Sequence, residues 1–101
     1  MTMFSVNYFM ESASEDDHDL LWEERIILVE AGSEDEAKEI ASTRAKSEEH
    51  SYSAEGKRID VKLYQVDRAC PIEGPLESGT ELFSRFLRQS EVESLQTAFD
   101  D

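Results

Sequence analysis

The chain begins with a strict alternation of hydrophobic and polar positions. One face carries large apolar side chains, at Phe4, Val6, Tyr8 and Met10. Ser5 and Asn7 fall on the opposite face. A period of two over residues 3–10 predicts a half-buried β-strand. The polar stretch Glu11–Asp19 has no residue that could anchor a core, so we interpret it as a solvated loop.

A second strand is expected over Leu20–Ala31. Its apolar run, Ile26 to Val29, is hydrophobic on both faces. A strand of that kind is typical of the middle of a sheet, so we expect it to be central.

The clearest local signal is a helix start at Ser33. Ser33 followed by Glu36 forms a capping box, in which the hydroxyl accepts from the Glu36 N–H. Acidic residues in this first turn suit the positive end of the helix dipole. A narrow stripe of mostly small residues follows, at Ala37, Ile40, Ala41 and Ala45. Its spacing predicts a helix to about His50 that lies close against a sheet.

Two further strands are predicted after this helix. Ser51–Lys57 is expected to be a loop around Gly56, and the third strand follows it. That strand places Ile59, Val61 and Leu63 on one face, and Tyr64 and Val66 on the other. Pro71 and Gly74-Pro75 end it. Alternation over Glu81–Arg88 predicts the fourth strand.

A short C-terminal helix completes the expected fold. Ser90 to Glu93 repeats the capping-box pattern, and Val92, Leu95 and Phe99 recur at helical spacing. The order is ββαββ, which predicts a single α+β domain over residues 1–101. We expect a four-stranded, mostly antiparallel sheet with the long helix on one face. We favour a crossover in which the helix joins paired second and third strands, and such a crossover would be right-handed.

Composition narrows the class of partner. The chain has 101 residues, with 24 acids against 10 Lys and Arg, so its formal charge is 10 − 24 = −14. An acidic protein is repelled by nucleic acid and by anionic membranes. No apolar run approaches the roughly 18 residues that span a bilayer, and residues 1–5 do not resemble a secretory signal. The single cysteine, Cys70, fits a reducing compartment, so we expect a cytoplasmic protein.

The search for catalytic or metal-binding chemistry yields no site. His18 lies among aspartates, but an EF-hand loop also needs alternating ligands, a central Gly and a distal Glu. His50 and His18 are not at zinc-motif spacing. Cys70 has no neighbouring His and is interpreted as a small, partly buried residue. We therefore expect no catalytic residues, no metal, no cofactor and no enzymatic activity.

Four residues are candidates for an interaction surface: Trp22, Glu23, Glu24 and Arg85. An arginine and a glutamate on different strands would form a cross-strand ion pair beside an aromatic ring. The alternative is a structural role, since exposed ion pairs contribute only about 0–1 kcal/mol. Glu23 and Glu24 are adjacent on a strand and point to opposite faces, so they cannot act jointly as acid and base.

The negative charge is unevenly distributed. Residues 1–24 carry −7 and residues 89–101 carry −4, whereas residues 57–68 carry +2. Such polarity would steer a basic partner. The same charge would also arise from selection for general solubility, or from the acidic proteome of a salt-loving host.

The chain resembles a small bacterial family known as domain of unknown function 4288. The likeness rests on three stretches: Leu21-Trp22-Glu23-Glu24-Arg25-Ile26, Ser33-Glu34-Asp35-Glu36-Ala37 and Gly79-Thr80-Glu81-Leu82-Phe83-Ser84-Arg85-Phe86. It extends from Phe4 to Phe86, and residues 87–101 continue past the usual end of the family. The resemblance implies a compact bacterial α+β domain. It implies no activity and no site residues.

Three functional hypotheses follow. The leading one is a non-enzymatic interaction module, immunity-like or regulatory, that binds a basic protein partner and forms a homodimer through a sheet edge. The second is a DNA mimic that inhibits a nucleic-acid-binding protein, which requires carboxylates spaced along one face. The third is a small ligand-binding or enzymatic domain whose pocket forms between protomers and gathers Arg85, Arg25 or His50.

Overall fold

The computed structural model describes residues 1–15 and 20–97. Within these ranges the elements are β1 (Thr2–Ser14), β2 (Leu20–Ala31), α1 (Glu34–Ser47), β3 (His50–Ala54), β4 (Lys57–Pro71) and α2 (Gln89–Thr97). His18 and its neighbouring aspartates lie outside the described residues, as does Phe99. Neither described helix is long and apolar enough to cross a bilayer.

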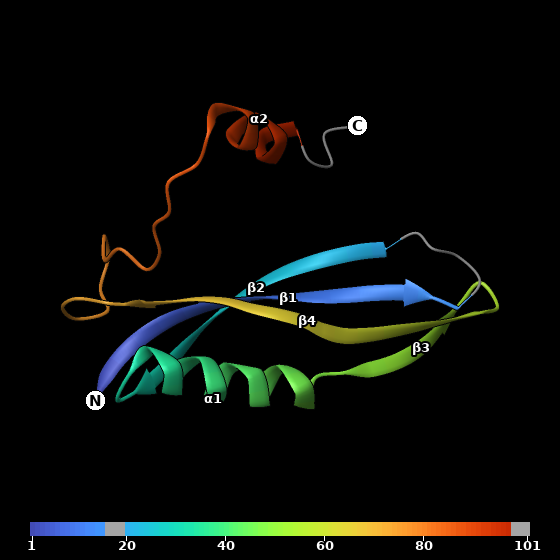
Figure 1. The fold of residues 1–101 in the computed structure, drawn as a ribbon, viewed down its shortest axis with the longest axis horizontal. Coiled ribbons are helices and arrows are strands. Elements are labelled where there is room, and N and C mark those ends of the chain that lie inside the picture. The colour runs from blue at the N-terminus through green and yellow to red at the C-terminus, as the bar shows by residue number, and fades with distance from the viewer. Residues whose placement is uncertain (16–19, 98–101) are drawn as a thin grey trace.

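The sheet confirms the predicted fold class. Its strand order is β2-β1-β4-β3, and every neighbouring pair is antiparallel. The helix α1 packs along one face, while the chain after β4 passes to the other side (Figure 1). The expected pairing of the second predicted strand with the third is wrong, because the third is β4 and β1 lies between β2 and β4. Both strands are antiparallel to β1, so β2 and β4 run parallel to each other, with α1 and β3 in the connection between them.

Three strand assignments differ from the predicted ones. Glu11–Ser14 continues β1 because its backbone is paired with β2 on one side and β4 on the other. Residues 50–54, predicted as helix end and loop, form the edge strand β3. The β3–β4 turn is tight because Glu55 and Gly56 both have positive φ, 53° and 77°. Residues 81–88, predicted as the fourth strand, form no strand.

The strand β2 is an edge strand, although its hydrophobic run predicts a central one. Ile27 and Val29 face α1 and the core. Ile26 and Leu28 point to the opposite face, where they remain 52% and 50% exposed. The two-sided hydrophobicity therefore marks a surface that α1 does not cover.

The helix α1 begins and packs as its sequence predicts. The Glu36 N–H donates to the Ser33 hydroxyl at 3.1 Å, which caps the first turn. Ala37, Ala41 and Ala45 are completely buried against the β1 side chains, whereas Ile40 is exposed. The buried stripe therefore consists only of alanines, and their small side chains let the helix lie close to the sheet.

Two β-bulges in β4 change which residues face the core. The register with β1 shifts between Asn7 and Tyr8 and between Phe9 and Met10, leaving Asp67 and Tyr64 as the extra residues. As a result Val66 faces α1 together with the preceding core positions of β4, not away from them as predicted.

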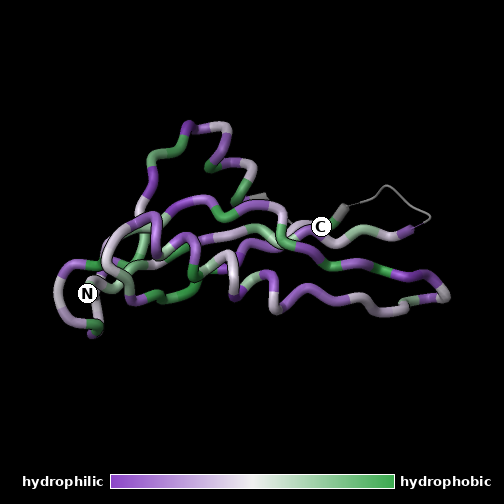
Figure 2. The backbone as a smooth tube through the Cα atoms, turned by 60° about the horizontal axis from the view of Figure 1, so that its bottom comes forward, coloured by the Kyte–Doolittle hydropathy of each residue, from purple (hydrophilic) through white to green (hydrophobic). Residues whose placement is uncertain are grey.

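Beyond β4 the chain crosses the face of the sheet opposite α1, which we call the open face. Residues 76–84, here named the strap, are fastened by a hydrogen bond from the Ser5 hydroxyl to the Leu82 carbonyl. Arg68 Nη1 also donates to the Ser84 carbonyl at 3.0 Å. Residues 85–97, here named the arm, then rise away from the sheet and end in α2 (Figure 1). Hydrophobic positions continue into this projecting part of the chain (Figure 2).

Candidate functional site

A buried asparagine organises the polar part of the open face. Asn7 Nδ2 donates to Glu24 at 2.9 Å and to Asp67 at 3.1 Å. Its Oδ1 accepts from the Arg68 backbone N–H at 3.0 Å. The side chain is fully buried and its polar atoms are all engaged. This cluster therefore ties β2, β1 and β4 together and leaves the Asn7 amide no hydrogen to offer a ligand.

An aromatic pair lies further along the same face. The rings of Trp22 and Tyr64 meet edge to face, with their centroids 4.5 Å apart. Tyr64 is one of the two bulge residues, so the bulge brings it into contact with Trp22 across β1. Both side chains remain exposed, as do Ile26 and Leu28 of β2. We call Trp22, Ile26, Leu28 and Tyr64 the open-face patch.

The four predicted interaction residues are distributed over three places. Trp22 and Glu24 share the open face, where Glu24 accepts from Asn7. Glu23 points to the opposite face and pairs with Arg25. Arg85 lies in the arm, with its guanidinium 6.0 Å from the centre of the Phe83 ring. Glu24 and Arg85, both within the described residues, form no ion pair with each other.

A second cluster lies on the α1 side, where the helix ends. Arg25 forms ion pairs with Glu23 and with Glu48, which joins the edge strand to the end of α1. The Tyr8 hydroxyl donates to Glu48 at 3.1 Å. Burial raises the pKa of the Tyr8 phenol above its ordinary value, and the hydrogen bond to Glu48 adds to this shift.

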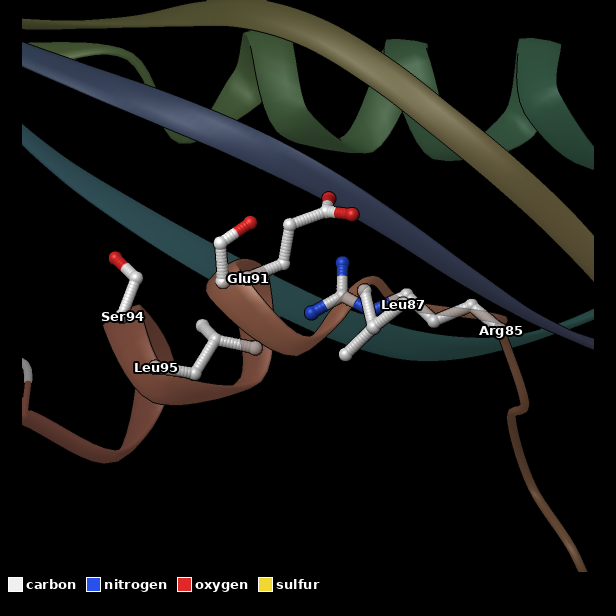
Figure 3. A pocket seen from close by; sticks show the side chains of 6 residues that line it. Arg85, Leu87, Glu91, Ser94 and Leu95 are labelled. Atoms are coloured by element: carbon white, nitrogen blue, oxygen red, sulfur yellow. The ribbon is translucent and has the colours of Figure 1, made fainter.

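Beside this cluster is a cleft of about 250 Å³, whose walls include Arg25, His50 and Tyr52. His50 Nδ1 lies 2.8 Å from the Glu48 carbonyl, which fixes its ring. Arg85 lies instead in a groove of about 320 Å³ at the start of α2, where Leu87 and Leu95 also point (Figure 3). Arg25 and His50 therefore line one cleft of this chain, whereas Arg85 lies in another groove.

The described residues contain no group of three His, Cys, Asp or Glu side chains placed to hold one metal ion. Cys70 is half-buried and carries a free thiol. Glu23 and Glu24 make their contacts on opposite faces, as the strand geometry predicts.

The most concentrated charge lies at the end of the molecule where β1 begins. Thr2 pairs with Ala31, and the Ile72 N–H donates to the Met3 carbonyl at 2.8 Å. The start of α1 and the segment after β4 therefore meet at this end (Figure 1). Seven exposed carboxylates are found there, and we call them the acidic end: Glu30, Glu34, Asp35, Glu36, Glu73, Glu77 and Glu81. The segments 1–10, 26–37 and 69–84 contain no Lys or Arg.

At the other end of the sheet, acids and bases are mixed. Glu11 pairs across strands with Lys62, and the Glu15 N–H donates to the Arg58 carbonyl at 3.2 Å. The basic segment 57–68 thus lies directly beside acids of the first 24 residues. Charge counts along the sequence missed the acidic end, because its carboxylates come from two segments about forty residues apart that only the fold brings together.

These features define an acidic α+β domain built on an antiparallel sheet, with a strap across its open face. The model of the family described as "Domain of unknown function (DUF4288)" matches residues 3–84. The chain therefore belongs to the DUF4288 family, as the sequence resemblance implies. The match ends at Ser84, the last residue of the strap, so the arm lies outside it. Neither a curated protein nor a solved structure matches the chain.

Proposed function

We propose that this protein is a non-enzymatic interaction module whose acidic end binds a basic surface of a partner protein. The observation that carries the proposal is the gathering of seven exposed carboxylates, with no Lys or Arg in the segments that supply them. A surface with one sign of charge accelerates the encounter with an oppositely charged partner and selects against like-charged ones.

The other two hypotheses find less support. A DNA mimic requires carboxylates along one extended face, whereas the long open face carries Lys62 and Arg68 among its acids. The ligand-binding or catalytic hypothesis requires Arg85, Arg25 or His50 at a pocket between protomers. Within one chain, Arg25 and His50 share a cleft, and Arg85 lies elsewhere. In addition, Arg25 is already engaged by two carboxylates, which leaves it poorly placed to bind an anionic substrate.

The proposal is tested by native mass spectrometry of the tagged full chain captured from a lysate of its own host. Capture at about 0.1 M and then about 1 M NaCl shortens the Debye length from about 10 Å to about 3 Å. A basic protein that is bound at low salt and released at high salt is the expected result. Recovery of the chain without a partner at both salts would contradict the proposal.

Two charge-matched variants locate the binding surface. E34Q/E73Q/E81Q neutralises three carboxylates of the acidic end, and E15Q/E55Q/E93Q neutralises three elsewhere, so both carry −14 + 3 = −11. At about 0.5 kcal/mol for each lost charge contact, the first variant should bind the partner about tenfold more weakly. The second should bind almost as tightly as the wild type. Equal losses in both would show that net charge, not the acidic end, governs binding.

A further inference from the structure

The arm displays an apolar surface that its own domain does not cover. The helix α2 contacts no other described helix or strand. Val92 and Leu95, three residues apart on α2, are exposed, and Phe86 in the preceding segment is fully exposed. Leu87 and Leu95 point into the groove of Figure 3, which residues of the arm alone line. An amphipathic helix presented in this way is typical of helix-in-groove recognition.

The same chain carries a matching acceptor. The open-face patch is a second exposed apolar surface, and the strap covers only part of the open face. Between the strap and β2 lies a groove of about 300 Å³, lined by three leucines and two polar residues: Leu28, Leu76, Leu82, Glu77 and Thr80. Apolar patches of this kind on a folded domain mark interaction sites.

Charge also permits two copies to approach through these surfaces. The arm contains Arg85, Arg88, Glu91 and Glu93, so its net charge is zero in a chain of −14. Near the patch and its groove, the carboxylates of Glu11, Glu24, Asp67 and Glu77 are partly offset by Lys62 and Arg68, which leaves −4 + 2 = −2. Neither surface carries the strong negative charge found elsewhere on the molecule.

We infer that two copies of the chain pair by exchanging arms, with the α2 helix of each copy lying on the open-face patch of the other. Each chain carries both the inserted helix, α2, and the patch that receives it. Two copies related by a two-fold axis therefore make the same contact twice and form a closed dimer. The arm already rises away from its own sheet (Figure 1), which leaves α2 free for a neighbour. This inference does not rest on the proposed function, because the contact is made by apolar side chains; Glu77 of the acidic end lines the groove beside them.

Sedimentation equilibrium of the full chain tests the exchange. Because the contact is apolar and the remaining charge repels, the dimer dissociation constant should fall severalfold as NaCl rises from about 0.1 M to about 1 M. A basic partner bound at the acidic end responds to salt in the opposite sense, so failures of the two proposals are distinguishable. A chain that stays monomeric at all concentrations and both salts would overturn the exchange.

Matched variants identify the contact. V92S/L95S removes two apolar side chains from each of the two arms, so the dissociation constant should rise at least about a hundredfold. The control I40S removes an exposed apolar side chain from α1, away from the arm and the open-face patch. It should change the dissociation constant less than about twofold. A dimer that V92S/L95S leaves intact would overturn the inference.

A mixing experiment separates exchange between copies from docking of the arm on its own sheet. I26T/L28T alters the acceptor with residues that suit a strand. Each double variant alone should be monomeric, and an equimolar mixture should form a heterodimer through the one intact arm and the one intact patch, detectable by native mass spectrometry. A mixture that remains monomeric while the wild type dimerises would overturn reciprocal exchange. If I26T/L28T does not fold, the result with V92S/L95S decides.

Discussion

The side-chain oxygen of Asn7 accepts a hydrogen bond from the Arg68 backbone N–H at 3.0 Å, next to one of the two bulges in β4. A bulge interrupts the regular ladder, and here a side chain takes over part of the backbone's role. The same amide holds Asp67, the extra residue of that bulge, at 3.1 Å. Asn7 thereby fixes the point at which β4 turns Val66 to the core and Asp67 to the open face.

Replacement of Asn7 should therefore lower the free energy of unfolding far more than the small size of this side chain suggests. Asn7→Ala leaves the buried Arg68 N–H without its acceptor and brings two carboxylates together without the amide between them. We expect a loss of about 2–4 kcal/mol in the free energy of unfolding, measured by urea denaturation. Ser53→Ala, an exposed position on β3, is the control and should stay within about 0.5 kcal/mol of the wild type. A loss of stability within about 0.5 kcal/mol for Asn7→Ala would contradict the proposed role of Asn7 at the bulge.

The alanine stripe of α1 predicts intolerance to larger side chains. Ala41 is fully buried against the sheet, so Ala41→Leu should destabilise the domain by about 1–3 kcal/mol through overpacking. Thr43→Leu introduces the same residue on the exposed side of the helix and should have little effect. Thermal unfolding followed by circular dichroism compares the two. Similar melting temperatures would mean that α1 is not held close to the sheet.

The environment of Tyr8 predicts a stability change at alkaline pH. Because the pKa of the Tyr8 phenol is raised in the folded state, the folded form favours the neutral phenol. This contribution is complete below about pH 10, the ordinary pKa of tyrosine, and is lost as pH rises through the folded value. Tyr8→Phe removes the hydrogen bond to Glu48 and should cost about 1 kcal/mol at neutral pH. As the pH rises further, this variant should lose less stability than the wild type.

Tyr52→Phe is the control for this prediction, because Tyr52 is exposed on the edge strand β3. Its stability should follow the wild-type pH profile. The measurement is urea unfolding at a series of pH values, together with tyrosinate absorbance to follow ionisation directly. Parallel pH profiles for Tyr8→Phe and the wild type would refute the assignment.

The strap depends on one aromatic side chain. The guanidinium of Arg68 lies 5.3 Å from the centre of the Phe83 ring, and Arg85 lies over the same ring. A cation–π contact of this kind contributes about 0.5–1 kcal/mol at an exposed site. Because Arg68 lies on β4 and Arg85 in the arm, Phe83→Ala should loosen the strap on the sheet by about 0.5–1 kcal/mol. Hydrogen exchange of residues 76–84 should accelerate accordingly. Phe86→Ala, two residues past the last strap residue and fully exposed, should leave that exchange unchanged.

Local signals in the sequence predicted the parts of the fold that local interactions decide. The capping box at Ser33 and the alternation of residues 3–10 require only near neighbours, and both elements form as expected. The edge strand β3 was missed because it is short and almost entirely exposed, with few apolar residues to mark a face, and pairing with β4 makes it a strand. Residues 81–88 alternate like a strand, but Leu82 and Ser84 are held over the face of the sheet by Ser5 and Arg68 and join no edge.

The bulges of β4 explain why the faces of that strand were misassigned. Its core residues Val61, Leu63, Val66 and Ala69 are spaced by two, three and three, so a strict period of two fails after Leu63. This spacing was a readable signal. The candidate site was harder to predict from the sequence, because the acidic end and the Asn7 cluster bring together residues that are distant along the chain. The sequence suggested an ion pair between Glu24 and Arg85, whereas in the structure Glu24 accepts a hydrogen bond from Asn7.

The central claim is that a basic partner binds at the acidic end. Hydrogen–deuterium exchange of the complex recovered from the host, compared with the free chain, tests it most directly. We predict slower exchange in residues 30–39 and 73–81 on binding, with little change in residues 50–62 at the opposite end of the sheet. Protection confined to residues 50–62, or to the arm, would contradict the claim.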